Sequence, residues 1–163
     1  MSRLLIVLCL SLLVAACGFK PRASLAVASS LGPVAVSTAD PYSPLGQDLA
    51  TALERAGATP AVEGQPAATL QVMAERMRTR PISFQRGASV REYQTLYRVD
   101  FQLTGADRKL RVPRQTVELT REYTYDAVGS IGSPAEERLL QEELRRDMVA
   151  TILRRLDAAL RAD

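Results

Sequence analysis

The residues of this chain that could carry out chemistry are few, because histidine is absent and cysteine occurs twice. Serine and cysteine nucleophiles need an adjacent base, a role that histidine usually fills. Zinc sites built on thiolates need several cysteines or histidines. Neighbouring glutamates such as Glu136 and Glu137 point apart on a helix, so they do not form a catalytic pair. The sequence therefore predicts no enzyme, no catalytic residue and no metal site.

Cys17 is the residue with the clearest chemical role, because it ends an apolar segment that follows a positive charge. Arg3 precedes a run from Leu4 to Ala16 that is apolar except for Ser11. The run is short for a membrane-spanning helix, and this order of charge, apolar run and small residues is typical of a secretory signal. Its last four residues, VAAC, resemble a bacterial lipobox. That resemblance implies cleavage before the cysteine, a diacylglyceryl thioether on its sulfur and acylation of the new amino group.

Two other interpretations of Cys17 are a buried apolar residue and a catalytic thiol. Its place at the end of a signal sequence favours lipidation over both. We therefore expect residues 1–16 to be a lipoprotein signal peptide and residues 17–32 to be the lipidated N-terminus and tether. Residues 33–163 are then one domain, long enough to bury a core. Gly18, where some lipoproteins have aspartate, favours the periplasmic side of the outer membrane by analogy with lipoprotein sorting. The covalent lipid is the only cofactor expected.

An arginine-rich stretch at residues 76–91 is the second feature of chemical interest. It reads RMRTRPISFQRGASVR and contains no acidic residue. Pro81 and Gly87 place its middle in a loop between two strands. The planar guanidinium group of arginine binds phosphate through two hydrogen bonds, which makes this loop a candidate site for a phosphate-bearing ligand. The alternative is a solvated loop in an arginine-rich protein. The candidate ligand-binding residues are Arg78, Arg80, Arg86 and Arg91.

Other charged residues have simpler interpretations. Arg108, Lys109, Arg111 and Arg114 lie around a predicted hairpin turn, and we expect them to form a solvated surface. Arg121 has the parity of an inward-facing strand residue, so we expect it to form a structural ion pair rather than to contact a ligand. The formal net charge of +3 is too small to indicate a nucleic-acid partner.

Hydrophobic periodicity predicts the elements that would position these side chains. Strands are expected near residues 34–36, 70–74, 93–103 and 117–125, where apolar and polar residues alternate. Gly105-Ala106-Asp107 is the expected turn between the last two strands. Residues 58–67 are expected to form a loop, and Pro113 is expected to break or bend an edge strand.

Two helices are predicted from capping residues and apolar stripes. The first begins at Ser43 and ends at Gly57. The second begins with the capping box of Ser133 to Glu136. Its apolar stripe comprises Leu140, Leu144, Met148, Ile152, Leu156 and Leu160. The order of elements predicts an α+β two-layer sandwich, with an approximately four-stranded mixed sheet and two helices on one face. The first two strands should be parallel and the later ones antiparallel.

The order of motifs resembles the lipopolysaccharide (LPS) assembly lipoproteins, the LptE family. Cys17-Gly18-Phe19 is followed by a tether and then by this order of elements. The segments REYTYD, from Arg121, and LRRDMVATILRRL, from Leu144, resemble the last strand and C-terminal helix of the family. The resemblance covers nearly the whole mature chain. It implies a non-enzymatic outer-membrane lipoprotein that forms a plug in the LPS-translocating β-barrel LptD, assists assembly of that barrel and binds LPS.

In this interpretation the partners are LptD, LPS and the membrane that holds the lipid on Cys17. Arg78, Arg80, Arg86 and Arg91 would contact LPS, whose lipid A carries phosphates. The basic residues around the predicted hairpin turn, which we call the second basic group, would alternatively face the rim of the barrel. They are Arg108, Lys109, Arg111 and Arg114. A competing interpretation is an auxiliary lipoprotein of an ABC-type lipid transporter, which can have a similar small α+β domain. A periplasmic lipid hydrolase is a third, and the absence of histidine argues against it.

Overall fold

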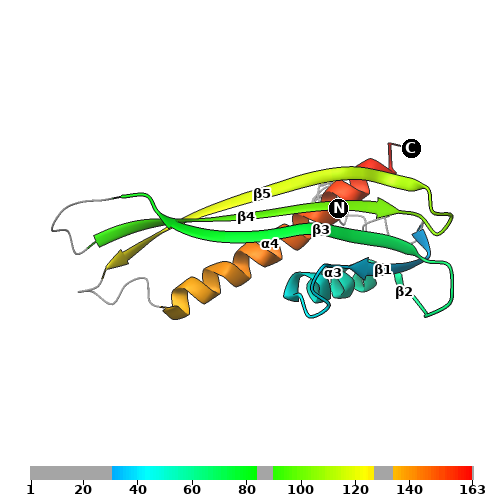
Figure 1. Cartoon of the computed structure of the whole chain (residues 1–163), viewed down its shortest axis with the longest axis horizontal. Coiled ribbons are helices and arrows are strands. Elements are labelled where there is room, and N and C mark those ends of the chain that lie inside the picture. The colour runs from blue at the N-terminus through cyan, green and yellow to red at the C-terminus, as the bar shows by residue number, and fades with distance from the viewer. Residues whose placement is uncertain (1–30, 84–89, 127–133, 163) are drawn as a thin grey trace, which may run out of the picture.

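The structure, a computed structural model of the chain, describes residues 31–83, 90–126 and 134–162. It is an elongated two-layer sandwich, with a five-stranded sheet in one layer and the helices α3 and α4 in the other (Figure 1). The strand order is β2-β1-β3-β4-β5; β1 is parallel to β2 and β3, and the later neighbours are antiparallel. The elements are β1 (Pro33–Ser37), α3 (Pro44–Arg55), β2 (Thr59–Pro60), β3 (Ala68–Pro81), β4 (Val90–Thr104), β5 (Leu110–Asp126) and α4 (Pro134–Leu160).

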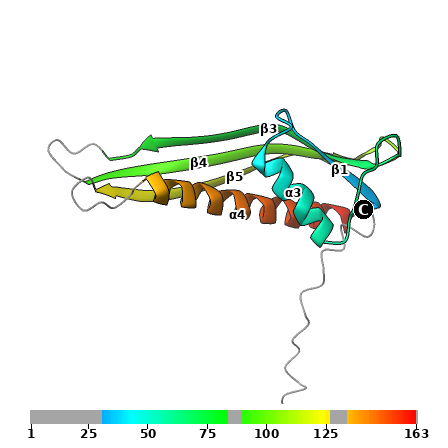
Figure 2. The same ribbon diagram turned by 90° about the horizontal axis from the view of Figure 1, so that it is seen from below.

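The predicted α+β class is confirmed, and both helices lie on the same side of the sheet (Figure 2). The predicted number of strands was wrong by one. The additional strand, β2, consists of Thr59 and Pro60, which the sequence had placed in a loop. It forms because Thr59 and Pro60 lie beside Pro33 and Val34 of β1. Two residues are too few to show a periodicity, so only this tertiary pairing reveals the strand.

The strand before the predicted loop is longer than the expected residues 70–74. β3 continues to Pro81 and pairs with β4 over its whole length. Ile82 donates its N–H to the carbonyl of Glu92 at 2.8 Å, so the preceding nitrogen, that of Pro81, points to the other edge. β1 pairs only with Ala68 to Gln71 of β3, and no described strand lies beside the rest of that edge. Proline is tolerated on such an edge because no ladder hydrogen bond is lost.

A register shift between Val72 and Ala74 explains why the sequence alternation is blurred in β3. Leu70 and Val72 are buried beneath the helices before the shift. After the shift, the helix-facing side passes to Glu75 and Met77, which pair with the helix-facing Val99 and Tyr97 of β4. A bulge of this kind inserts one residue and moves the following side chains to the opposite parity.

The helices begin and bury their apolar stripes as expected. Ser43 caps α3 by accepting a hydrogen bond from the N–H of Gly46 at 3.3 Å, and Gly57, with φ of 102°, follows its end. Ser133, the predicted cap of α4, lies outside the described residues. The middle of the predicted α4 stripe is fully buried: Leu144, Met148, Ile152 and Leu156. They pack in one core with Leu45 and Leu49 of α3 and with Tyr97 and Phe101 of β4.

One of the polar contacts between the two layers centres on Glu75. Glu75 of β3 accepts hydrogen bonds from the hydroxyl of Tyr97 at 2.7 Å and from Ser43, the cap of α3, at 2.9 Å. Burial and the contact with Glu75 raise the pKa of Tyr97. The tyrosine hydroxyl therefore remains protonated and serves as a donor, which satisfies a polar atom that would otherwise be costly to bury.

Pro113 lies at an irregularity of the edge strand β5, as predicted. Phe101 pairs with Gln115 and Leu103 with Val112, so β5 has one more residue than β4 across this interval. Asp100, 5% exposed, holds the two strands together here. It accepts hydrogen bonds from Arg114 at 2.5 Å and from Thr116 at 2.7 Å. These bonds lower the pKa of Asp100 below its ordinary value of 3.8.

Truncation of Leu49 should test the packing of α3 on the sheet. Leu49 is fully buried, so Leu49→Ala should lower the free energy of unfolding by about 2–5 kcal/mol. Leu110 is 57% exposed, so Leu110→Ala should change it by less than about 0.5 kcal/mol. Urea unfolding followed by circular dichroism measures both. Equal losses at the two positions would contradict the observed burial of α3.

Substitution of Asp100 should destabilise the protein in a pH-dependent way. Asp100→Asn removes a charged acceptor from Arg114, and we expect a loss of about 1.5–3 kcal/mol near neutral pH. Because the folded pKa is depressed, the carboxylate stabilises the fold above its ordinary pKa of 3.8 and loses this effect as the pH falls through the folded value.

The difference in unfolding free energy between wild type and Asp100→Asn should therefore shrink below about pH 4. Urea titrations across the acid range measure this difference. Glu118→Gln is the matched control, because Glu118 is an exposed carboxylate on the neighbouring strand whose nearest arginine contact is 3.9 Å. A difference for Asp100→Asn that stays constant down to low pH would show that the charge of Asp100 contributes nothing.

Candidate functional site

The face of the β3–β4–β5 sheet that points away from α3 and α4 carries a group of arginines. We call it the open face, because none of the described elements covers it (Figure 2). On β3 the arginines alternate with Met77 and Thr79, and on β4 Arg98 lies between the buried Tyr97 and Val99. Since successive strand residues point to opposite faces, the arginines share the open face. They are Arg76, Arg78, Arg80 and Arg98.

Arg80 is held in place by a chain of hydrogen bonds across three strands. Its Nε and Nη2 donate to the side-chain oxygen of Gln94 at 3.2 and 2.9 Å. Gln94 in turn donates from Nε2 to Glu122 of β5 at 3.0 Å. The guanidinium group is therefore oriented by a neutral amide, and the acidic member of this hydrogen-bonded series, Glu122, lies two strands away.

Positive charge is less balanced along β3 than on the rest of the open face. Arg98 lies 3.6 Å from Asp100 and 3.9 Å from Glu118, so it has acidic neighbours. Arg76 stands directly opposite Arg98 in the register, which places two like charges together. In the part of the chain that the structure describes, no hydrogen bond or ion pair is present at the side chains of Arg76 and Arg78. These two guanidinium groups are available to an anion.

At the end of the sheet where β3 ends and β4 begins, the positive open face lies opposite an apolar surface on the helix side. Tyr93 and Tyr123 stack on the helix side of the sheet, with ring centroids 5.4 Å apart and planes inclined by 17°. Burial, followed by the nearby Glu137, raises the pKa of Tyr123. Leu139, near the start of α4, is a large apolar side chain that remains 53% exposed. Arginines on one side of the sheet and apolar groups on the other suit a ligand that is itself amphiphilic.

The structure brings together only part of the predicted ligand-binding set. Arg78 and Arg80 lie two residues apart on the open face, on a strand rather than in the predicted loop. The backbone of Arg91 lies on β4 opposite Tyr125, and its side chain is outside the described part. Arg86 and Cys17 also fall outside the described residues, so their roles stay predictions.

Arg98 was missed, although its parity in the predicted strand at residues 93–103 was a usable signal. Arg76 belonged to the arginine-rich stretch but was not among the chosen residues. The register of β3 and β4 is what shows that Arg98 adjoins the others.

The remaining charged groups follow the structural interpretations. Arg121 donates to Asp147 of α4 at 2.7 Å, so the expected structural ion pair is confirmed. In the second basic group, Arg111 pairs with Asp107 at 2.9 Å and all four members are exposed. Within residues 31–83, 90–126 and 134–162, no group of acidic or cysteine side chains is arranged to hold a metal ion. No helix in these ranges is both long and apolar enough to cross a bilayer.

The fold is shared with solved structures of bacterial lipoproteins. An uncharacterized lipoprotein B from Nitrosomonas europaea has a TM-score of 0.71 at 25% identity, covering 86% of this chain and 91% of that one. A minor lipoprotein from Acinetobacter baumannii has a TM-score of 0.64 at 19% identity, covering 78% and 91%. Rare lipoprotein B from Shewanella oneidensis has a TM-score of 0.63 at 19% identity, covering 77% and 94%.

Of the two sequence comparisons, one finds a match. No curated protein sequence matches the chain significantly. The family model described as "LptE: Lipopolysaccharide-assembly" matches residues 31–156. This range runs from the start of β1 to the last turns of α4 and includes all five strands. The chain therefore belongs to the LptE family of lipopolysaccharide-assembly proteins.

Proposed function

We propose that this protein is an outer-membrane lipoprotein that forms a plug inside the LPS-translocating β-barrel LptD and assists assembly of the barrel. Membership of the LptE family supports this role. The proposal includes cleavage of residues 1–16, a lipid on Cys17, a tether at residues 17–32 and a periplasmic domain at residues 33–163. The role is one of binding, without catalysis or a cofactor beyond the lipid.

The second part of the proposal is that the open face binds LPS during its insertion into the outer leaflet. The observation that carries it is that the guanidinium groups of Arg76 and Arg78 lie on the open face and have no partner among the described residues. Each phosphate of lipid A offers oxygen acceptors that match the two parallel donors of an arginine. Arg80, already oriented by Gln94, extends this row of donors along β3.

The geometry also fits a location inside a barrel. The lumen of an outer-membrane barrel is lined by polar groups, and a protein within it needs a polar surface. The open face supplies one, because glutamines, threonines and charged side chains occupy its exposed positions on β3, β4 and β5. The competing role, an auxiliary lipoprotein of an ABC-type transporter, draws no comparable support from the family match.

Affinity purification should test the barrel part of the proposal. The full-length protein, extracted from membranes with mild detergent, should co-purify with one large β-barrel chain in equal amount. Mass spectrometry of intact and digested chains identifies the partner and its stoichiometry. Recovery with an inner-membrane ATPase complex would favour the transporter role, and recovery of the protein alone would remove the support for a plug.

Charge reversal on β3 should test the LPS part. The double variant Arg76→Glu/Arg78→Glu should weaken LPS binding by at least about tenfold, because two charge-assisted contacts become repulsive. The matched control is Arg154→Glu, an exposed arginine in the helix layer, which donates to Thr151 of its own helix α4. Binding is measured by titration of fluorescent LPS at two salt concentrations. Equal affinities of the two variants would place LPS elsewhere.

A further inference from the structure

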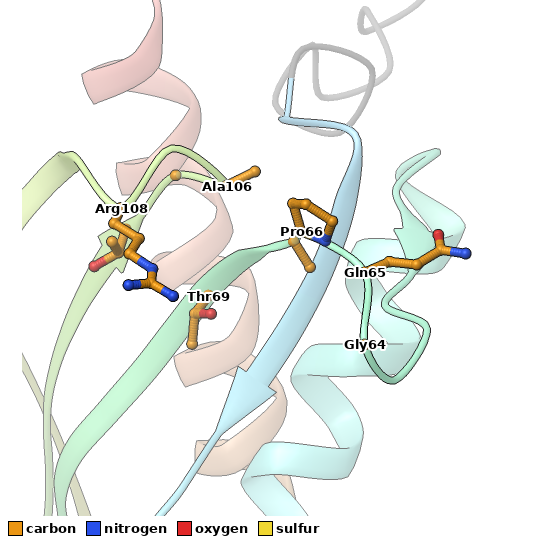
Figure 3. A pocket seen from close by; sticks show the side chains of 9 residues that line it. Gly64, Gln65, Pro66, Thr69, Ala106 and Arg108 are labelled. Atoms are coloured by element: carbon orange, nitrogen blue, oxygen red, sulfur yellow. The ribbon is translucent and has the colours of Figure 1, made fainter.

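The end of the sheet opposite the stacked tyrosines has a pocket that the proposed function does not use. It has a volume of about 470 Å³ and lies between the loop before β3 and the turn between β4 and β5. Gly64 to Ala67 form one wall, and Thr104 to Ala106 with Arg108 form the other (Figure 3). Thr69 and Thr104, adjacent in the register, close it between these walls. We call this region the turn end.

Arg108 presents a guanidinium group at the mouth of this pocket. Figure 3 shows its side chain extending toward Thr69. The backbone φ of Arg108 is 62°, a left-handed conformation that glycine adopts far more readily than arginine. The turn is closed by hydrogen bonds from Arg108 N to Gly105 O at 2.9 Å and from Gly105 N to Lys109 O at 2.8 Å. No partner binds the guanidinium group among the residues that the structure describes.

In the turn between β4 and β5, positive charge exceeds negative charge. Asp107 accepts from the backbone N–H of Lys109 at 3.1 Å and from Arg111 at 2.9 Å. The contact with the Lys109 N–H is the main reason why the pKa of Asp107 is lowered. Since Asp107 and Arg111 compensate one another, the charges of Arg108 and Lys109 remain uncompensated within the turn.

Large apolar side chains accompany these charges. Leu110 follows Lys109 directly and is 57% exposed, and Val62 in the loop before β3 is 58% exposed. Neither is needed to fill the core. Basic residues beside exposed apolar ones are typical of surfaces that contact the interface of an anionic membrane, where the charges meet headgroups and the apolar groups enter the acyl boundary.

The position of the tether agrees with such a contact. β1 begins at Pro33, and Val34 lies beside Ala68, one residue from the Thr69–Thr104 pair. The first residues of β1 are therefore at the turn end. Pro33 follows Cys17 by 16 residues, a segment that reaches at most about 55 Å when extended. A lipid on Cys17 would hold this end of the domain, rather than the end with the stacked tyrosines, close to the membrane.

From this geometry we infer that the turn end docks on the glycerophospholipid surface that holds the lipid anchor. Arg108 and Lys109 contact anionic headgroup phosphates, and Leu110 enters the interface. The docking rests on the lipidation of Cys17 that the proposed function includes. A second, weaker membrane contact beside the lipid would fix the orientation of the long axis of the domain relative to the bilayer.

A single reporter cysteine tests this inference. Leu110→Cys, carried on the mature full-length protein and labelled with the fluorophore nitrobenzoxadiazole, is reconstituted into vesicles of phosphatidylcholine with or without phosphatidylglycerol. With phosphatidylglycerol the emission should rise by about twofold or more and shift to the blue. Arg108→Gln/Lys109→Gln should abolish the rise. The matched control is Leu139→Cys, an exposed leucine near the start of α4, whose emission should not change.

The outcomes separate this inference from the proposal on which it rests. The protein without a reporter takes up the thiol label only if Cys17 is free, and such uptake would refute the lipidation. A blocked Cys17 with an unchanged Leu110→Cys reporter would overturn the docking alone. A response to LPS micelles in place of phosphatidylglycerol vesicles would overturn the choice of glycerophospholipid.

Discussion

The packing of α4 along one face of the long β3–β4–β5 sheet is the constraint on which the rest of the structure depends. Leu144, Met148 and Ile152 are fully buried against this face. A strand has a period of two, so covering one face with apolar side chains leaves every second residue for the other face. The arginines of the open face exist as a group because the helix takes their neighbours into the core. Burial on one side thus arranges charge on the other.

The same constraint decides which irregularities the sheet can contain. An extra residue in β3 between Val72 and Ala74 moves the following side chains to the opposite parity, and the arginines then fall on the open face. In β5, the extra residue near Pro113 is stabilised by Asp100, a nearly buried carboxylate that binds Arg114 and Thr116. The irregularity in β5 is thus stabilised by hydrogen bonds to Asp100, and the one in β3 decides which face its later side chains occupy.

Sequence reasoning recovered the two helices, most of β4 and β5 and the class of fold, because these elements carry a long periodic pattern. Of β3 it recovered only residues 70–74. Arg121 was assigned correctly, since its parity conflicted with its charge and so required a partner. β2 and the bulge in β3 were not recoverable, because a two-residue strand and one inserted residue leave no periodic trace. The phosphate-binding role of Arg78 and Arg80 stays a prediction. Their place on a strand was not foreseen, since Pro81 was taken as a sign of a loop rather than of a strand edge. Cys17, Arg86 and Arg91 stay predictions.

The edge of β3 beyond Gln71, which no described strand covers, has a consequence for how copies of the protein meet one another. An exposed strand edge is a template for pairing with a further strand, and a long one invites self-association. Two copies aligned along this edge would place the guanidinium groups of Arg76, Arg78 and Arg80 beside the same groups of the other copy. Electrostatic repulsion between them opposes such a dimer before any other contact forms. The charge of these arginines therefore disfavours self-pairing along this edge and favours partners that bring negative charge to it.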